Sequence, residues 1–458
     1  MELRKEIFRE YDIRGIYKSE LNEEIAYLIG LAYGSVLQKE YNKRKCIVGY
    51  DNRLSSVSLY ENLIKGITDT GVDVISIGLT TTPMYYFAWD HFKIKCGVMI
   101  TASHNPKEYN GFKFSYNGLH NAYGSDVTHL YDVILENDFC QGTGKVINEK
   151  IEEEYIKLLL ENIKLGNRKL KVVFDCGNGT TSILAKKVLS QLNIDLVNLY
   201  DISDGNFPNH HPDPCDENNL TDLKRKVIET KADIGVAYDG DGDRVGVVDE
   251  KGNYIPSDLF MIIIWRNIYD KVTLKKGLLD IKCSKALADE MIKLGIEPVF
   301  YRTGNSYTKA KMVSDKLPFG GELSGHIYFQ DKFPGYDDGI YASLRIIEIL
   351  SNTDKLLSSL LDGINKYYNT PEIKIKTSDE IKFKVIAKLK EYATINQLNY
   401  LDIDGVKILF DDGFAVIRAS NTGPNITMRF ESNNIEKLEK MKEFYINLTN
   451  KYIDELSI

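Results

Sequence analysis

Short apolar, β-branched runs alternate with longer amphipathic segments along most of this chain, and this alternation limits the folds that it can adopt. The first series begins near residue 46 and runs through "CIVGY", "LYENLIKGITDTG", "VDVISIG", "PMYYFAWDHF" and "CGVMIT". A second series starts at "KLKVVFDCGNGTTSILAKKVLSQL" and a third near "YIPSDLFMIIIW". Strand-like and helix-like segments in alternation are typical of βα units, so we expect α/β domains built on largely parallel sheets.

The last part of the chain has a different pattern. The stretch "DGVKILFDDGFAVIRASNTGPNITMRFES" alternates in period two, and the helix-like "NIEKLEKMKEFYINLTNKYIDEL" follows it. This pattern predicts a smaller α+β domain at the C-terminus. The chain length of 458 residues also exceeds what one hydrophobic core usually serves, which favours about two to four domains and a cleft between them.

Composition argues against several classes of protein. A formal net charge of -8 argues against a general nucleic-acid-binding protein, whose binding surface is normally basic. The six cysteines are scattered without a C-x-x-C pair, so neither a zinc site nor a disulfide framework is indicated. The N-terminus lacks the apolar core of a signal peptide, and the strongest apolar run, "LFMIIIW", is far too short to span a membrane. We therefore expect a cytoplasmic, soluble protein with neither nucleic acid nor membrane as a partner.

An acidic motif lies between two apolar runs in "IGVAYDGDGDRVGVVDEKG". Asp239, Asp241 and Asp243 are spaced two apart, and the intervening glycines allow three carboxylates to converge on one hard cation, for which Mg²⁺ is the natural candidate. An EF-hand loop is excluded although Glu250 falls at its twelfth position, because Arg244 stands where that loop needs glycine. A plain acidic hairpin turn stays open as the alternative.

The segment "MITASHNPKEYNGFKFS" follows a predicted strand, and open α/β sheets bind ligands beyond the carboxyl ends of their strands. Ser103 in this loop lacks the G-x-S-x-G context of a serine hydrolase nucleophile. The ordinary alternative is that Ser103 is only a turn-forming residue. Its adjacency to His104 does not imply contact. A phosphorylated Ser103 fits better, because Asn105, Asn110 and Lys113 could steady its charge.

The segment "FGGELSGHIYF" combines glycines, a carboxylate, a hydroxyl and an imidazole. Glu322 could accept hydrogen bonds from the hydroxyls of a sugar, and His326 could move a proton at neutral pH. A buried histidine with a structural role explains the same residue equally well.

The segment "IRASNTGPNITMRF" gathers a cation and several hydrogen-bond donors in one tight loop. Arg418, Ser420, Asn421 and Thr422 would suit a phosphate dianion. A hairpin with Ser and Asn as turn-forming residues is the structural alternative.

Taken in order, "TASHNP", "DGDGDR", "GELSGH" and "RASNTGP" resemble the motifs of the α-D-phosphohexomutase family, and "YDIRG" near the N-terminus matches its usual start. The likeness covers essentially the whole chain and is strongest to the bacterial phosphomannomutase/phosphoglucomutase branch. It implies four domains around a central cleft, three of them α/β with mixed sheets and a smaller C-terminal one of α+β type. We expect the phosphoserine loop in residues 1–145, the metal loop in 146–252, the sugar loop in 253–368 and the phosphate loop in 369–458.

The resemblance also implies a function. Members move a phosphoryl group reversibly between O1 and O6 of a hexose phosphate, through a phosphoserine enzyme and a hexose 1,6-bisphosphate that also activates the enzyme. Mannose or glucose phosphates are the expected substrates, and Mg²⁺ the expected cofactor. A phosphoglucosamine mutase, a metal-dependent sugar phosphatase and a catalytically inert sugar-phosphate sensor remain as alternatives.

Site residues follow from matching the motifs position by position. The resemblance implies catalytic roles for Ser103, His104, Lys113, Arg244 and His326, and a metal held by Ser103, Asp239, Asp241 and Asp243. It implies that the substrate is bound by Tyr11, Arg14, Lys282, Asn305, Glu322, Ser324, His326, Arg418, Ser420, Asn421 and Thr422. Asn305 stands where dual-specificity enzymes often carry a histidine that contacts the sugar. Sugar phosphates are the expected partners of a monomer or weak homodimer.

Overall fold

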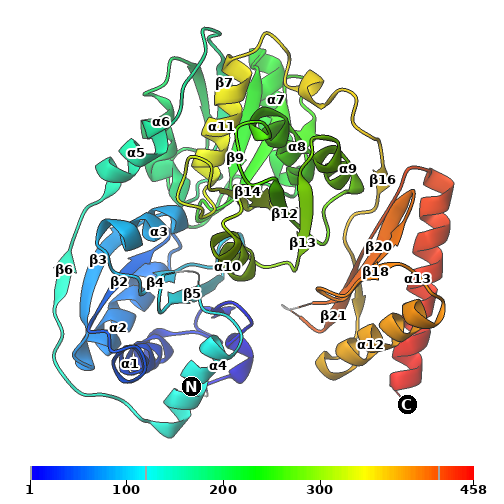
Figure 1. Ribbon diagram of the computed structural model, residues 1–458. Helices are drawn as coiled ribbons and strands as arrows, with labels where there is room; N and C mark the ends of the chain where they lie inside the picture. The colour runs from blue at the N-terminus through cyan, green and yellow to red at the C-terminus, as the bar shows by residue number, and fades with distance from the viewer. Residues whose placement is uncertain (1–2, 119–120, 421–422, 458) are drawn as a thin grey trace.

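The computed structural model describes residues 3–118, 121–420 and 423–457. Four groups of elements follow one another along the chain (Figure 1): the N-terminal unit in blue to cyan, two adjoining units from teal through green to yellow, and a C-terminal unit in orange and red. The fold class expected from the sequence, three α/β units and a smaller α+β unit, is confirmed.

The N-terminal unit contains a mixed sheet in the order β1-β5-β4-β2-β3-β6. Its strands are β1 (Ile13–Ile16), β2 (Lys45–Tyr50), β3 (Asp73–Leu79), β4 (Gly97–Ile100), β5 (Tyr109–Ser115) and β6 (Val146–Asn148). Its helices are α1 (Glu23–Lys39), α2 (Ser56–Asp69), α3 (Thr82–His91) and α4 (Ser125–Glu136). The predicted domain boundary after residue 145 falls just before β6, which pairs in parallel with β3 as the chain leaves along this sheet edge.

The two following units are also built on mixed sheets, in the orders β11-β10-β9-β7-β8 and β13-β12-β14-β15. The first has β7 (Lys171–Asp175), β8 (Asp195–Leu199), β9 (Ile234–Tyr238), β10 (Val245–Asp249), β11 (Tyr254–Ile255), α5 (Glu152–Glu161), α6 (Ala185–Leu189) and α7 (Thr221–Thr230). The second has β12 (Lys276–Asp280), β13 (Glu297–Tyr301), β14 (Phe319–Gly321), β15 (Ile327–Phe329), α8 (Ser257–Ile268), α9 (Lys285–Lys293), α10 (Asn305–Asp315) and α11 (Gly339–Ser351).

The C-terminal unit places two helices against an antiparallel sheet ordered β16-β21-β20-β19-β18, with β17 also paired to β21. Its elements are β16 (Tyr368–Asn369), β17 (Ile373–Lys376), β18 (Tyr400–Leu401), β19 (Val406–Phe410), β20 (Gly413–Ala419), β21 (Asn425–Ser432), α12 (Asp379–Ile395) and α13 (Ile435–Leu456). Short 3₁₀ helices lie elsewhere along the chain at η1 (Lys5–Ile7), η2 (Thr180–Ile183), η3 (Glu217–Leu220) and η4 (Ser358–Leu361).

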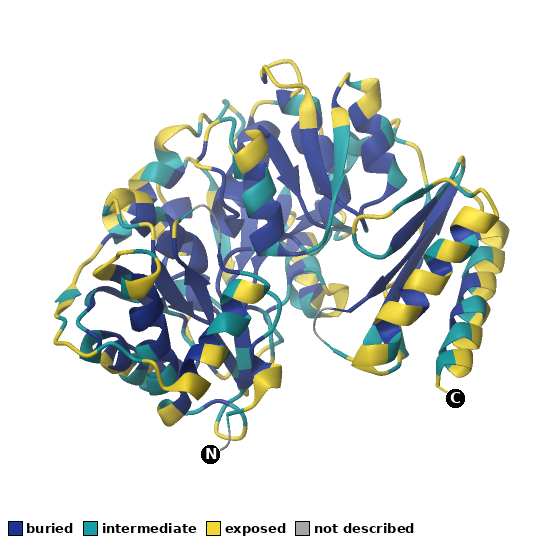
Figure 2. Cartoon of the chain, turned by 60° about the horizontal axis from the view of Figure 1, so that its bottom comes forward, coloured by how far each residue is buried: buried dark blue, intermediate teal, exposed yellow. Residues whose placement is uncertain are grey.

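The apolar cores set the C-terminal unit apart from the other three. One continuous apolar cluster runs through the first three units and includes Trp89 of α3, Trp265 of α8 and Tyr341 of α11. The C-terminal unit has its own cluster, with Phe430 of β21 and Tyr445 of α13. The inner strands of the sheets are buried, while β6, β16 and β17 carry exposed residues, and most other exposed residues lie on the outer faces of the helices and on loops (Figure 2). Within the described ranges, no helix has the length and apolar character needed to cross a membrane.

Candidate active site

The four motif loops share one structural context. Each connects two consecutive antiparallel strands: β4 to β5, β9 to β10, β14 to β15, and β20 to β21. A cleft of about 620 Å³ is lined by side chains from all four units. Although the chain is acidic as a whole, the cations Arg9, Arg14, Lys113, Arg244, Lys282, Lys374 and Arg418 line this cleft. Positive charge is therefore gathered locally, as an anionic ligand requires.

Ser103 lies in the loop between β4 and β5, buried where this loop meets the acidic loop. Its backbone has φ +50°, the left-handed region that few residues other than glycine adopt. Its Oγ donates to Asp239 Oδ2 at 3.1 Å and lies 3.4 Å from Nδ1 of His104. Burial, followed by the cations Arg244 and Arg14, lowers the pKa of His104 well below its usual range, so this imidazole is neutral.

The three aspartates are fully buried and lie close enough together to hold one ion. The acidic loop packs tightly against the serine loop, since a Cβ at Gly240 would lie 2.6 Å from the carbonyl oxygen of Ser103. Burial and the charges of Asp243 and Asp241 raise the pKa of Asp239 well above its usual range. The pKa of Asp241 is lowered although burial opposes this, because Lys113 and the Thr82 hydroxyl stabilise its charged form.

The acidic loop fits a hard divalent cation. Among the described residues, no hydrogen-bond partner satisfies Asp241 Oδ1 or Asp243 Oδ1, although both atoms are buried. Lys113 Nζ bridges the other oxygens of the same two carboxylates, at 2.9 Å and 2.8 Å. Buried carboxylate oxygens without a partner are unfavourable, and a bound cation would satisfy them.

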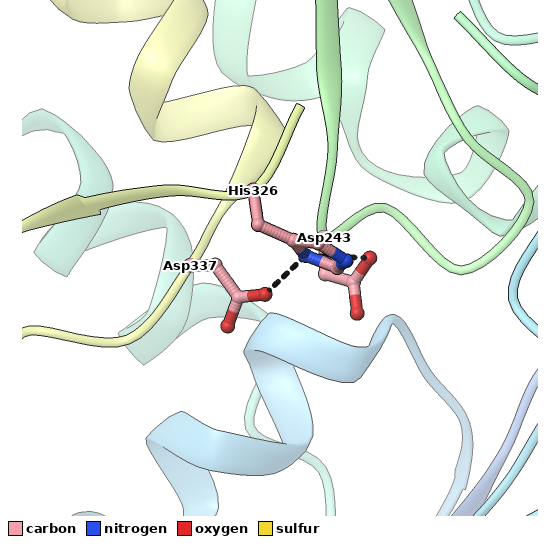
Figure 3. A group of neighbouring side chains, drawn as sticks. All are labelled: Asp243, His326 and Asp337. Carbon is pink, nitrogen blue, oxygen red and sulfur yellow. Dashed lines mark hydrogen bonds and ion pairs between the residues drawn. The ribbon is translucent and has the colours of Figure 1, made fainter. Parts of the chain in front are cut away.

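Arg244 and His326 join the acidic loop to the sugar loop. Arg244 Nε donates to His326 Nε2 at 3.0 Å, and His326 Nδ1 lies 2.6 Å from Asp337 Oδ2. Figure 3 shows the imidazole between Asp337 and Asp243. Because Nε2 accepts a hydrogen bond, the ring carries its proton on Nδ1 and donates it to Asp337. The amide of Asn305 also donates to Asp337, so this side chain braces the pair as well as lining the cleft.

The sugar loop presents a buried carboxylate. Glu322 Oε1 accepts from the Thr308 hydroxyl at 2.6 Å, while Oε2 accepts from Ser324 Oγ and from the backbone N–H of Gly304, each at 3.3 Å. Burial raises the pKa of Glu322 above its usual value. Glu322 and Ser324 both line the cleft, where a polyhydroxylated ligand could reach them.

The C-terminal unit closes the cleft from another side. Arg418 is buried and donates from Nε to Asp404 Oδ2 at 2.9 Å, and Ser420 lines the cleft beside it. Lys282 lies 3.5 Å from Glu372 and links the third unit to the fourth. The predicted ligands Asn421 and Thr422 lie outside the described residues.

The N-terminal motif also reaches the cleft. The Tyr11 hydroxyl donates to the carbonyl of Thr303 at 3.3 Å, and Arg14 donates to Asn105 Oδ1 at 2.9 Å and pairs with Asp12. Every described residue that the sequence assigned to the site therefore lies in the cleft or beside it.

Several supporting residues were missed by sequence reasoning. Thr82 holds Asp241, Thr308 holds Glu322, and Asp337 orients His326. Lys382 Nζ donates to the carbonyls of Ser420 and Gly423, at 2.7 Å and 3.2 Å. These partners are separated from the motifs by tens of residues or lie outside any recognisable pattern, so no local signal marks them.

Comparison with known proteins identifies the family. Models described as phosphoglucomutase/phosphomannomutase alpha/beta/alpha domains I, II and III match residues 5–140, 153–252 and 256–367, and the C-terminal domain model of the same family matches residues 372–448. Together the matches cover most of the chain.

Individual relatives agree along the full length. The chain is 39% identical to a phosphomannomutase/phosphoglucomutase of Pseudomonas syringae pv. tomato over 95% of this chain and 93% of the relative. It is 36% identical to a phosphoglucomutase of Neisseria gonorrhoeae, over 96% and 95%. A crystal structure of a phosphoglucomutase/phosphomannomutase family protein from Burkholderia thailandensis superposes with a TM-score of 0.91 at 34% identity, covering 98% of both chains. The chain belongs to the phosphoglucomutase/phosphomannomutase family and is a phosphohexomutase.

Proposed function

We propose that this phosphohexomutase moves a phosphoryl group between O1 and O6 of glucose and mannose phosphates, with Ser103 as the carrier. Hexose 1,6-bisphosphate is the intermediate and, when added, the activator. The observation that carries the proposal is the position of Ser103 Oγ, 3.1 Å from Asp239 in a cleft that Arg418 lines from the C-terminal unit. Relatives whose names include both phosphomannomutase and phosphoglucomutase support both sugars.

The reaction needs one transfer in each direction. The bond between phosphorus and Ser103 Oγ breaks while the free hydroxyl of the bound monophosphate bonds to phosphorus, and the proton of that hydroxyl passes to an acceptor. The bisphosphate then turns over and returns its other phosphoryl group to Ser103. Arg418 and Ser420 bind whichever phosphate is not being transferred. Glu322 and Ser324 accept hydrogen bonds from the sugar hydroxyls in either orientation of the sugar.

Mg²⁺ would be held by Asp239, Asp241, Asp243 and phosphorylated Ser103, and when bound it would neutralise charge on the transferring group. Arg244, whose pKa is raised by neighbouring carboxylates against the effect of burial, stays charged and can bind an equatorial phosphate oxygen. If the Arg244 guanidinium bound such an oxygen, it would no longer donate a hydrogen bond to His326 Nε2.

His326 is the better proton acceptor of the two candidates. Asp337 fixes the proton on Nδ1, which leaves Nε2 as the basic atom once Arg244 engages phosphate. Lys113 lies between two carboxylates, and despite burial they raise its pKa well above the usual range. Its ammonium therefore has no lone pair to accept a proton and is suited to stabilise charge.

The proposal includes sugar phosphates as the ligands of a cytoplasmic monomer or weak homodimer. The described cysteines are all unpaired, and Cys46, Cys96, Cys176 and Cys283 are buried, which suits a reducing compartment. Sedimentation at several protein concentrations would establish the oligomeric state.

The first experiment is a coupled assay with glucose, mannose and glucosamine 1-phosphates, Mg²⁺ and a trace of glucose 1,6-bisphosphate. We expect turnover of the glucose and mannose compounds, and loss of turnover by at least about 1,000-fold in Ser103→Ala because the carrier is gone. Ser125→Ala at the start of α4 is the control, with activity like wild type. Full activity of Ser103→Ala, or phosphate release that matches substrate loss, would refute the proposal.

A further inference from the structure

Arg53 is buried directly behind the phosphoserine loop, and neither the motifs nor the proposed chemistry assign it a role. It lies in the segment between β2 and α2, with its side chain wholly withdrawn from solvent. Asp51 Oδ2 accepts from its Nε at 3.1 Å, and the ring of Phe207 lies 5.4 Å from the guanidinium carbon. The charge is therefore buried with a partner, and solvent has no access to it.

The other guanidinium donors bind carbonyl oxygens of the loop between β4 and β5 and of Tyr109, the first residue of β5. Nη2 donates to Ser103 and to Asn105, both at 2.7 Å, and Nη1 donates to Pro106 at 2.7 Å and to Tyr109 at 3.1 Å. Guanidinium has five N–H groups. With the bond from Nε to Asp51, each of them has an acceptor.

This arrangement determines which way the loop faces. Four carbonyls are drawn back onto Arg53, so the Ser103 side chain is left to face the acidic loop, where Oγ meets Asp239. The left-handed backbone of Ser103 is unfavourable and persists only where its surroundings hold it. The bond from Arg53 to the Ser103 carbonyl, and the bond from the Ser103 N–H to Thr101 Oγ1 at 2.8 Å, hold it from both sides.

We propose that Arg53 is a positioning residue for the phosphoryl carrier: by binding four carbonyls it fixes the conformation in which Ser103 exchanges its phosphoryl group. The inference rests on the proposed function, because only a carrier serine needs this alignment. Lysine cannot replace arginine here, since an ammonium is a single point with three donors and cannot reach four carbonyls and a carboxylate in one plane.

The test compares Arg53→Lys with Arg345→Lys. Arg345 is equally buried and binds Asp331 with both terminal nitrogens at 2.8 Å and 2.7 Å, but it does not line the cleft. We expect Arg53→Lys to lower kcat about 10- to 100-fold with KM changed less than about threefold, because a misplaced reacting group costs rate while the sugar contacts stay intact. Arg345→Lys should lower thermal stability and leave kcat per folded molecule unchanged.

A second readout does not depend on turnover. Amide hydrogen exchange over residues 101–110 should be faster in Arg53→Lys than in wild type and unchanged in Arg345→Lys. Arg53→Gln, which keeps two donors and no charge, replaces the lysine variant if that variant does not fold, with the same results expected. An unchanged kcat in both Arg53 variants, a KM effect alone, or unchanged exchange over this loop would overturn the inference. Absence of turnover in wild type would instead refute the proposed function, and with it the carrier role of Ser103, while the exchange data would still show whether Arg53 holds this loop.

Discussion

At the scale of single residues, the most unusual charge outside the cleft is the ammonium of Lys309 on α10. It is buried against the rings of Tyr86 and Trp89 of α3, 3.1 Å and 4.3 Å from their centroids, and the described residues give it no hydrogen-bond acceptor. Cation–π contact stabilises the charge only in part. Burial therefore lowers the pKa of Lys309 to about 7.

This shift predicts a pH dependence of stability. Between pH 7 and the ordinary lysine value of 10.5 the unfolded chain binds a proton that the folded chain has lost, so stability rises with pH across this window. We expect denaturant titrations at pH 7 and pH 10 to show wild type gaining on the order of a few kcal/mol relative to Lys309→Met. Lys384→Met, which removes an exposed lysine of α12, is the control. A parallel pH response of Lys309→Met and wild type would contradict the buried-charge interpretation.

At the scale of elements, α12 supports the phosphate loop that joins β20 to β21. Lys382 of α12 donates to carbonyls on both sides of residues 421 and 422, and its ammonium also pairs with Asp379 at 2.6 Å. The helix therefore holds the described ends of this loop, at Ser420 and Gly423.

Lys382→Met should release that loop and weaken binding of the phosphate that is not transferred. Because this phosphate is bound alike in the ground state and the transition state, we expect KM to rise about tenfold or more and kcat to change less than about threefold. Steady-state kinetics would measure both, with Lys384→Met as the matched control. A fall in kcat at constant KM would show that the loop acts in the chemical step instead.

The four hairpins also show what the sequence could predict. The motifs correctly identified the family and the fold class, and the described motif residues do meet in one cleft. The alternation of strands and helices predicted largely parallel sheets, and the family resemblance predicted mixed ones. The first three sheets are mixed, since each of their motif loops returns along an antiparallel strand. Because β5 returns antiparallel to β4, its residue Lys113 comes within 2.9 Å of Asp241 in the second unit and can pair with that carboxylate. Arg53, Asp337 and Lys309 could not be predicted, because their roles depend on partners brought together only by the tertiary fold.

At the scale of the whole molecule, the C-terminal unit has its own core and a small apolar contact with the third unit. Phe414 and Val416 of β20 pack on Ile281, and Lys407 of β19 lies over the Phe414 ring and donates to the carbonyl of Cys283. Polar contacts such as that of the Lys285 N–H with Glu431 add to this interface. Because the C-terminal unit has its own core and its apolar interface is small, we expect it to move relative to its neighbours.

We therefore expect calorimetry to resolve two unfolding transitions, the smaller from the C-terminal unit. Glucose 1,6-bisphosphate with Mg²⁺ should raise the temperature of the smaller transition, because a ligand that bridges the cleft stabilises both parts that bind it. Mg²⁺ alone, which has its predicted ligands outside this unit, should leave that transition in place. A single transition without ligand, or no response to the bisphosphate, would contradict this division.

The left-handed backbone at Ser103 restricts which alcohol can serve as the carrier. Threonine carries an equivalent hydroxyl, but β-branched side chains are genuine outliers at positive φ, so the loop that Arg53 holds would reject it. Aspartate tolerates this conformation far better and could present a permanent negative charge in the same place. The backbone geometry at this position thus favours serine over threonine as the carrier alcohol. Aspartate is the natural residue that would imitate the charge of phosphoserine here but could not pass a phosphoryl group on.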